Sequence, residues 1–315
     1  MSSTPYPYIS VVVPTYNRPT TLAGCLRALA AQEYPRDRFE VIVVNDGGVE
    51  SPDQVVNPYR NTLTCRVVHQ TNRGPAAARN HGAKEAVGQF LAFTDDDCAP
   101  APDWLRRLSE RFLQARETAV GGETRNALNE NLYSVASQLL VSYLVDYYNG
   151  TPQRIRFFPS SNLAFPAEHF RSIGGFSSAY PRAAGEDREL CDRWQHEGHR
   201  IMHAPEAVVY HSHQLGAGAF LRQHFQYGCG AFHYHQHRAR HRGQSLRIEP
   251  PAFYLRLFAY PFRKISWGHA LRVVPLLIAA QAANAAGFFW QRAKGVPACA
   301  PDMVRPGNDM TRGVK

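Results

Sequence analysis

Three consecutive carboxylates, Asp95-Asp96-Asp97, are the side chains in this sequence best suited to chemistry. They follow Phe90–Phe93, an apolar run with the length and composition of a buried strand. Like charges this close together are tolerated when they are solvated, partly protonated or bridged by a cation. Because carboxylates and substrate phosphates are the ligands that Mg²⁺ and Mn²⁺ take, the triplet predicts a divalent metal site. An acidic loop preceding the helix expected from Pro102 is the alternative interpretation.

Two further polar turns follow apolar runs of the same kind. The runs Ile9–Val13 and Val41–Val44 lead into Pro14-Thr15-Tyr16-Asn17 and Asn45-Asp46-Gly47-Gly48, respectively. Leucines at 22, 26 and 29 indicate a helix after the first of these turns. A further strand at Cys65–Val68 leads through Asn72-Arg73-Gly74-Pro75 into an alanine-rich helix at 76–86. Buried strands that alternate with helices predict a parallel sheet covered on both faces, and such sheets bind ligands outside the carboxyl ends of their strands. We therefore expect residues 15–17, 46–48 and 95–97 to converge on one edge.

The second half of the sequence has a mixed pattern. It predicts helices at 131–148 and 186–196 and strands at 162–165 and 208–211. The helix at 186–196 begins with Glu186 and Asp187, directly after Gly185. Acidic residues favour a helix amino terminus on structural grounds alone, and one carboxylate there could also act as a general base.

Four other side chains in this half have two interpretations each. His211 and His213 end the last predicted strand and could add a metal or phosphate ligand, although a packed or solvated histidine is the commoner case. Trp194 and Phe176 fit either the wall of an acceptor pocket or the core, and the core is favoured.

Several short motifs occur in a fixed order over about residues 8–211. They are VVVPTYNRP at 11–19, VVNDGG at 43–48, NRGPAAARN at 72–80, FTDDD at 93–97, and then Gly174-Gly175-Phe176 and Gly185-Glu186-Asp187. The ordered series resembles that of the family 2 glycosyltransferases. The resemblance implies a GT-A fold, which is an α/β fold with a nucleotide-binding, Rossmann-like, mostly parallel sheet flanked by helices. It also implies a nucleotide-diphosphate sugar donor, a divalent metal (Mn²⁺ or Mg²⁺) and inversion at the anomeric carbon.

The resemblance further implies roles for residues on the donor side. Pro14 and Thr15 would border the nucleotide, with Asn17 beside them. Asp46 would accept a hydrogen bond from the base, and Arg79 would lie near the diphosphate.

The same resemblance assigns the metal and acceptor sides. Asp95 and Asp97 match the outer positions of the family's D-x-D element, so Asp97 would contact the metal and Asp95 the ribose or the metal, with Asp96 between them on the donor side. Asp187 matches the general base, and Glu186, in the same signature, would lie on the acceptor side. His211 as a further metal ligand and Trp194 on the acceptor side are candidates from their positions in the sequence, not from the resemblance.

One position departs from a known pattern of this family. Processive polysaccharide synthases carry a Gln-x-x-Arg-Trp signature, whereas Leu190 stands at the glutamine position before Arg193-Trp194. No other Arg-Trp pair occurs in the sequence. The departure favours an enzyme that adds a single sugar.

Charge is distributed very unevenly along the 315 residues. Residues 1–219 hold 21 Lys or Arg against 23 Asp or Glu, whereas residues 220–300 hold 11 Lys or Arg against Glu249 alone. We therefore expect a catalytic domain at 1–219, with a donor half at about 8–100 and an acceptor half at about 101–219, followed by a basic, partly apolar helical region at 220–315. Such a basic segment predicts an anionic partner or surface.

The segment from Val273 to Trp290 is almost wholly apolar or small and has basic residues on both sides. Its 18 residues are at the lower limit for a membrane span, so an interfacial helix is favoured over a crossing, and a helix packed on the catalytic domain is the alternative. The expected acceptor is accordingly a glycan or a lipid-linked or envelope component. The scattered cysteines and the lack of a signal-like amino terminus predict a reduced, cytoplasmic chain, which could lie peripherally on the inner face of the membrane.

Two other functions compete with this interpretation. Arginines and aromatic residues at 222–247 could form a nucleic-acid-binding arm of a non-catalytic protein. A sugar-phosphate nucleotidyltransferase would share nucleotide binding at a sheet edge, but its glycine-rich basic loop is absent from Pro14–Pro19.

Overall fold

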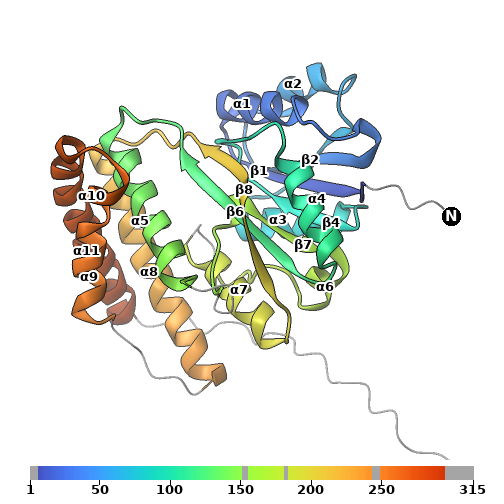
Figure 1. Cartoon of the computed structure of the whole chain (residues 1–315). Helices are drawn as coiled ribbons and strands as arrows, with labels where there is room; N and C mark the ends of the chain where they lie inside the picture. Colours follow the sequence, from blue (N-terminus) through green and yellow to red (C-terminus); the bar gives the residue numbers. More distant parts are fainter. Residues whose placement is uncertain (1–5, 151–154, 181–183, 243–248, 295–315) are drawn as a thin grey trace, which may run out of the picture.

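An eight-stranded mixed sheet lies at the centre of the molecule (Figure 1). The structure is a computed structural model that describes residues 6–150, 155–180, 184–242 and 249–294, and the strand count refers to these residues. The strands are arranged in the order β3-β2-β1-β4-β7-β6-β8-β5. Their bounds are β1 Ile9–Thr15, β2 Phe39–Asp46, β3 Cys65–Gln70, β4 Phe90–Phe93, β5 Cys98–Pro100, β6 Ala119–Asn126, β7 Leu163–Pro166 and β8 Ile201–His211.

The first half of the sheet is parallel, which confirms the prediction from alternating strands and helices. β1 pairs in parallel with β2 and β4, so that Val11 lies between Val41 and Ala92, and β2 pairs in parallel with β3. Helices α1 (Pro19–Ala30) and α4 (Trp104–Gln114) cover one face, and α3 (Pro75–Glu85) covers the other. Burial on both faces explains why β1, β2 and β4 are apolar without alternation.

The second half of the sheet contains two strands that the sequence pattern did not reveal, β6 and the three-residue β5. β7 is antiparallel to both β4 and β6, and β6 is parallel to β8. β6 has no strand-like pattern because it contains Gly121 and Gly122, and the register with β8 shifts just after them. A Cβ atom on Gly121 would overlap the Phe158 ring at 2.0 Å, so tight packing requires glycine where a strand residue is expected.

Two helices frame the second half of the sheet as predicted. The helix expected at 131–148 is α5 (Leu132–Tyr148), and the one expected at 186–196 is α7 (Glu186–His196). Asn131 caps α5 by accepting a hydrogen bond from the Ser134 N–H at 2.9 Å. Of two shorter helices, α6 (Ala167–Ser172) follows β7 in this part, whereas α2 (Asp53–Val56) belongs to the first half and packs against α1 and β3.

After β8 the described chain is helical. The helices are α8 Ala217–Arg242, α9 Pro251–Ala259, α10 Pro261–Lys264 and α11 Trp267–Lys294. Figure 1 shows them gathered with α5 beside the sheet. α8 and α11 approach closely at two glycines, because a Cβ on Gly228 would lie 1.9 Å from the Asn284 carbonyl oxygen, and one on Gly287 would lie 1.9 Å from that of Phe225. α11 includes the apolar segment 273–290 and is longer than it at both ends.

Candidate active site

The carboxyl ends of β1 and β4 meet, as expected for neighbouring parallel strands. The Thr15 hydroxyl at the end of β1 donates a hydrogen bond of 2.7 Å to Oδ2 of Asp96, which follows β4. Both residues are buried. The structure therefore brings the first polar turn and the acidic triplet together at one edge of the sheet.

Arg18 braces the triplet from the first turn. Its guanidinium forms an ion pair with Asp96 and donates a 2.9 Å hydrogen bond to Oδ2 of Asp97. The sequence motif contained Arg18, but sequence reasoning assigned it no role. Burial raises the pKa of Asp96 to about 6, even though Arg18 and Thr15 oppose that shift.

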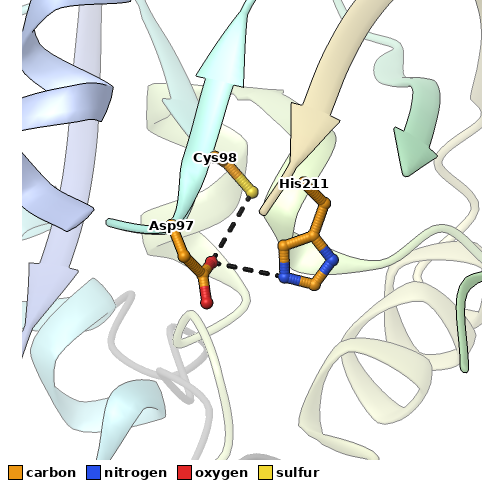
Figure 2. Close-up of side chains that lie close together, drawn as sticks. All are labelled: Asp97, Cys98 and His211. Atoms are coloured by element: carbon orange, nitrogen blue, oxygen red, sulfur yellow. Dashed lines mark hydrogen bonds and ion pairs between the residues drawn. The ribbon is translucent and has the colours of Figure 1, made fainter. Parts of the chain in front are cut away.

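Asp97, Cys98 and His211 lie together where β5 pairs with β8 (Figure 2). Oδ1 of Asp97 lies 3.3 Å from Nε2 of His211 and accepts a 3.9 Å contact from the Cys98 thiol. Although burial opposes both shifts, the hydrogen bond and charge attraction in this pair lower the pKa of Asp97 and raise the pKa of His211. Burial, followed by the charge of Asp97, raises the pKa of Cys98, so its sulfur stays a thiol and is a poor ligand.

These donor atoms fit a divalent metal of the type that the sequence predicts. A carboxylate oxygen and an imidazole nitrogen suit Mn²⁺ well, and Mg²⁺ prefers oxygen ligands. Asp95 is the most exposed side chain of the triplet and lies two residues from Asp97. Asp97 and His211 could hold the metal together with Asp95. His213 lies next to them, its ring 5.2 Å from that of His211.

Arg79 connects the triplet to the start of α7. Its guanidinium is 3% exposed and donates to Oδ1 of Asp95 at 2.7 Å and to Oε1 of Glu186 at 3.1 Å. Nε of Arg79 is buried and has no hydrogen-bond partner among the described residues. Arg79, which was predicted near the diphosphate, thus connects Asp95, predicted on the donor side, with Glu186, predicted on the acceptor side.

Asp187 lies one residue beyond this buried pair. Gly185 permits the turn that starts α7, since its φ of 91° lies in the left-handed region. Oδ1 of Asp187 accepts a 2.7 Å hydrogen bond from the Arg188 N–H. Burial and then the charge of Glu186 raise the pKa of Asp187 to about 7, and Arg79 opposes the shift. A carboxyl group of this kind can accept a proton near neutral pH.

A cavity of about 240 Å³, here called the central cavity, connects these groups. Asp95, Arg79, Glu186, Asp187 and His211 all line it. Its remaining wall includes residues from the helices after β8 that sequence reasoning missed: Tyr227, Ala231 and Tyr234 from α8 and Asn284 from α11. The motifs gave no signal for them, because they reach the cavity through helix packing.

A second cavity of about 620 Å³, here called the lateral cavity, lies beside α5. Its lining includes Lys264 at the end of α10, Ser266 just before α11 and His269 in the first turn of α11. Four residues line both cavities: Thr124, Gln138, Val141 and Pro159. The two cavities are therefore neighbours across a thin wall.

The predicted donor residues outside the triplet have structural partners of their own. Asp46 accepts hydrogen bonds from Gln70 Nε2 at 2.7 Å and from the N–H groups of Arg73 and Gly74, both at 2.9 Å. Asn17 has a φ of 53°, and its side chain accepts a 2.8 Å hydrogen bond from the Val49 N–H. Pro14 is buried within β1. Asp46 and Asn17 thus shape the turns beside the edge.

Trp194 lies in the core, which is the interpretation that the sequence favoured. Its side chain is completely buried, its ring centroid lies 4.9 Å from that of Phe165, and its Nε1–H donates to the Arg200 carbonyl at 2.8 Å. It lines neither cavity described above. The wall of an acceptor pocket is therefore not the favoured position for Trp194, because its side chain packs toward the sheet. Phe176 is also buried, in contact with Phe93.

Comparison with known proteins identifies the family to which the chain is similar. The family described as "Glycosyl transferase family 2" matches residues 10–174, and "N-terminal domain of galactosyltransferase" matches residues 146–214. Among curated relatives, glycosyltransferase AglE of Haloferax volcanii is 34% identical over 39% of this chain and 40% of its own. Chondroitin synthase of Escherichia coli is 26% identical over 66% of this chain and 35% of its own. The matches thus span less than half of either relative.

Solved structures show the same fold. A mannosyltransferase from Pyrobaculum calidifontis, in complex with GDP-Man and Mn²⁺, superposes with a TM-score of 0.58 at 23% identity, covering 89% of this chain and 76% of its own. Residues 1–349 of Staphylococcus aureus TarS superpose with a TM-score of 0.54 at 19% identity, covering 91% of each chain. The α/β fold expected from the sequence motifs is therefore confirmed.

Proposed function

Because the chain belongs to glycosyltransferase family 2, we propose that it moves one sugar from a nucleotide-diphosphate sugar to an acceptor hydroxyl, with inversion and with a divalent metal. The observation that carries the proposal is the central cavity, which Asp95 from the strand edge and Asp187 from α7 both line. Glycosyl transfer needs a site for the diphosphate and a base near the attacking hydroxyl, held in one geometry. The cavity offers both within one space.

Asp97, His211 and Asp95 would hold Mn²⁺ or Mg²⁺ on the donor side. The bound ion would offset the negative charge that develops on the departing diphosphate. Arg18 and Arg79 fix the triplet carboxylates in place by the ion pairs described above. Pro14, Thr15, Asn17 and Asp46 would border the nucleotide from the adjacent turns.

Asp187 would act as the general base. Inversion by a single displacement needs one base, placed on the acceptor side of the sugar. A pKa of about 7 lets the Asp187 carboxylate take the proton of the acceptor hydroxyl at neutral pH. The Glu186 carboxylate is occupied by Arg79 and the Ala184 N–H, which leaves proton transfer to Asp187.

Donor binding tests this proposal directly. We expect at least one nucleotide-diphosphate sugar to raise the melting temperature with Mn²⁺ present and to raise it less without metal, because a ligand of the native state stabilises it by mass action. The panel should include GDP-mannose and UDP-GlcNAc, the donors bound by the mannosyltransferase and by TarS. No stabilisation by any member of the panel would contradict the proposal.

The proposed enzyme is non-processive, since Leu190 replaces the glutamine of the processive signature. We assign the catalytic carboxylates to residues 1–219, with the donor half at about 8–100 and the acceptor half at about 101–219. The helices of 220–315 would complete the cavity wall and have a separate role besides. The acceptor is proposed to be a glycan or a lipid-linked component. The protein would act in the cytoplasm, at the inner face of the membrane, where the basic helices would meet anionic lipid.

A nucleic-acid-binding function is not favoured. Arg238, one of the arginines of that hypothesis, lies 3.6 Å from Asp192 and over the Tyr234 ring at 5.5 Å. It is therefore engaged within the protein fold. Arg247 lies outside the described residues. The family match likewise does not favour a nucleotidyltransferase.

A further inference from the structure

The outer face of α11 carries a row of apolar side chains along its whole length. Its members are all exposed and recur every three or four residues: Trp267, Leu271, Pro275, Ile278, Ala282, Ala285 and Phe289. This spacing places them on one face of the helix. At 1.5 Å per residue the row is roughly 33 Å long. A surface helix in water normally carries polar residues on its outer face, so this row calls for a partner.

The opposite face of α11 packs against the rest of the protein. Ala270, Val273, Leu277 and Ala280 are buried on the side that faces α5 and α8. α9 packs against α11 and adds another exposed apolar residue, Leu255. The apolar surface therefore belongs to a fixed part of the molecule.

The charges around this row are positive. Arg263, Lys264 and Arg272 lie near its start, and Arg292 and Lys294 lie at its end. No charged residue occurs in the sequence between Arg272 and Arg292. The two ends also carry the exposed tryptophans, Trp267 at 71% and Trp290 at 53%. Indole rings and basic side chains are the groups that favour the interface of an anionic bilayer.

We infer that the outer faces of α9 and α11 form a membrane-docking surface that lies flat on an anionic lipid bilayer. The inference deepens the proposed function and rests on it only for the acceptor, which would be presented from the lipid. A symmetric contact with a second copy would bring the basic ends of two α11 helices together and would repel. Anionic lipid complements these same ends.

The packing of α11 explains why it lies on the bilayer rather than crossing it. α11 is long enough to span, and an 18-residue window within it has a mean hydropathy of 1.5, but the close approach at Gly228 and Gly287 ties it to α8. α8 carries Arg222, Gln223 and Arg238, so a crossing would take polar and charged side chains into hydrocarbon. In the flat orientation only the apolar row enters the bilayer surface.

Docking also places the lateral cavity at the bilayer. Lys264, Ser266 and His269 line that cavity and lie next to Trp267 at the start of the row. The lateral cavity shares Thr124 and Gln138 with the central cavity. A lipid-linked acceptor would thus reach Asp187 along the side of α5.

The four tryptophans make the inference measurable without any substitution. Trp104 and Trp194 are completely buried, whereas Trp267 and Trp290 lie on the proposed surface. Adding vesicles of phosphatidylcholine with phosphatidylglycerol should shift the emission to shorter wavelength and co-sediment the protein, and vesicles of phosphatidylcholine alone should do so much less. High salt should release the protein, because screening weakens exposed charges. The double variant Trp267→Phe with Trp290→Phe should lose the emission shift while still co-sedimenting.

Matched variants distinguish vesicle binding through the apolar row from nonspecific hydrophobic adsorption. The triple variant Leu271→Ser, Ile278→Ser and Phe289→Ser should reduce vesicle partitioning at least about tenfold. Its control, Val49→Ser with Val87→Ser, removes two exposed apolar side chains far from α11 in the sequence and should leave vesicle partitioning unchanged. Arg272→Gln with Arg292→Gln leaves the apolar packing intact and should reduce partitioning about 25-fold, since each basic residue contributes about fivefold.

Three outcomes would overturn the inference. They are absence of binding to either kind of vesicle, binding that resists both high salt and alkaline washing as a membrane span does, and a lipid-free dimer that the triple serine variant dissociates. Mn²⁺-dependent donor binding, measured on the same variants, should be unchanged. Failure of donor binding with intact vesicle binding would refute the proposed function and leave the docking surface standing.

Discussion

The two walls of the central cavity differ in chemistry and in origin. The donor wall is Asp95, in the turn that follows β4, together with Arg79, and it is held by ion pairs. The adjoining Asp96 and Asp97 do not line the cavity and pair with Arg18. The helical wall, Tyr227, Tyr234 and Asn284, is neutral and comes from α8 and α11, far along the chain. One wall is fixed by backbone topology and charge, and the other by helix packing.

Under the proposed function, this difference predicts which part of the reaction each wall controls. A donor diphosphate carries the same charge in any sugar nucleotide, so a charged wall built on strand ends suits it. Acceptors vary, and a wall of aromatic and amide side chains on packed helices can vary with them. Asp187 lies between the two walls and should belong functionally to the acceptor side.

Substituting Asp187 should give the largest effect and tests that assignment. Asp187→Asn should reduce turnover by about 10²-fold or more, because the variant cannot accept the proton of the attacking hydroxyl. Its affinity for the donor identified by thermal shift should be nearly unchanged. The measurement is initial rate beside donor titration by calorimetry. Loss of donor affinity would instead move Asp187 to the donor wall.

Substituting Asp97 should break the donor wall alone. Asp97→Asn removes a proposed metal ligand and the partner of His211, so Mn²⁺-dependent donor affinity should fall by about 10- to 100-fold. The folded state should persist, as far-ultraviolet circular dichroism can check. Asp103→Asn, which changes an acid of the same type outside the cavity, serves as the control. Equal donor affinity of the variant and the parent protein in Mn²⁺ would exclude this role.

The sequence predicted the donor wall better than the helical wall, for physical reasons. Asp95, Asp97 and Thr15 occupy turns whose position is set by local strand patterns, and parallel pairing brings them together. Arg18 and Arg79 were present in the motifs, but their ion pairs depend on side-chain conformations that local pattern does not determine. For Trp194 the sequence left two interpretations open, acceptor-pocket wall and core, and the packing places its side chain in the core.

The elements of secondary structure also differ in how well the sequence predicts them. Continuous apolar runs revealed β1, β2 and β4, whereas β6 was missed because Gly121 and Gly122 avoid clashes that only the folded structure creates. The apolar segment 273–290 was recognised by composition, yet its contribution to the central cavity through Asn284 was not. Contacts between helices distant in sequence leave little trace in either helix.

Substitutions of two glycines of α11 test whether close packing of α8 and α11 holds the helical wall in place. Gly287→Ala would place a Cβ against the backbone of Phe225 on α8, so the helices must separate, and stability should fall by about 1–3 kcal/mol. The control is Gly268→Ala in the same helix, where nothing lies within 4 Å of the added atom. That change should be neutral or slightly stabilising. Chemical unfolding measures both, and equal effects of the two variants would argue against close helix packing.

The pH dependence of turnover should follow Asp187. Its pKa of about 7 means that the base is protonated below neutral pH, so kcat/KM should rise about tenfold per pH unit below about pH 7 and level off above it. The Asp187→Asn variant should lose this rise of kcat/KM with pH. A profile that stays flat between pH 5 and pH 8, over about three units around that value, would rule out Asp187 as the titrating base.

The smallest expected effect is that of Asp187→Asn on the stability of the folded protein. This substitution should raise stability although it lowers turnover. The folded pKa of Asp187, about 7, lies above the value of about 3.9 for an aspartate in an unfolded chain. The folded protein therefore holds this proton more tightly, and stability is lost as the pH rises from about 4 through about 7. An asparagine side chain at this position does not ionise, so it avoids both this loss and repulsion by Glu186.

The Asp187→Asn variant should accordingly melt about 2–4 °C above the parent protein at pH 8, if about 1 kcal/mol is relieved. Near pH 4, where the carboxyl is largely protonated in both states, the two proteins should melt together, which provides the internal control. A lower melting temperature for the variant at pH 8 would show that the hydrogen bond from the Arg188 N–H outweighs the burial of charge. A higher one, together with lost turnover, would show that the acceptor side maintains a destabilising charge because the reaction uses it.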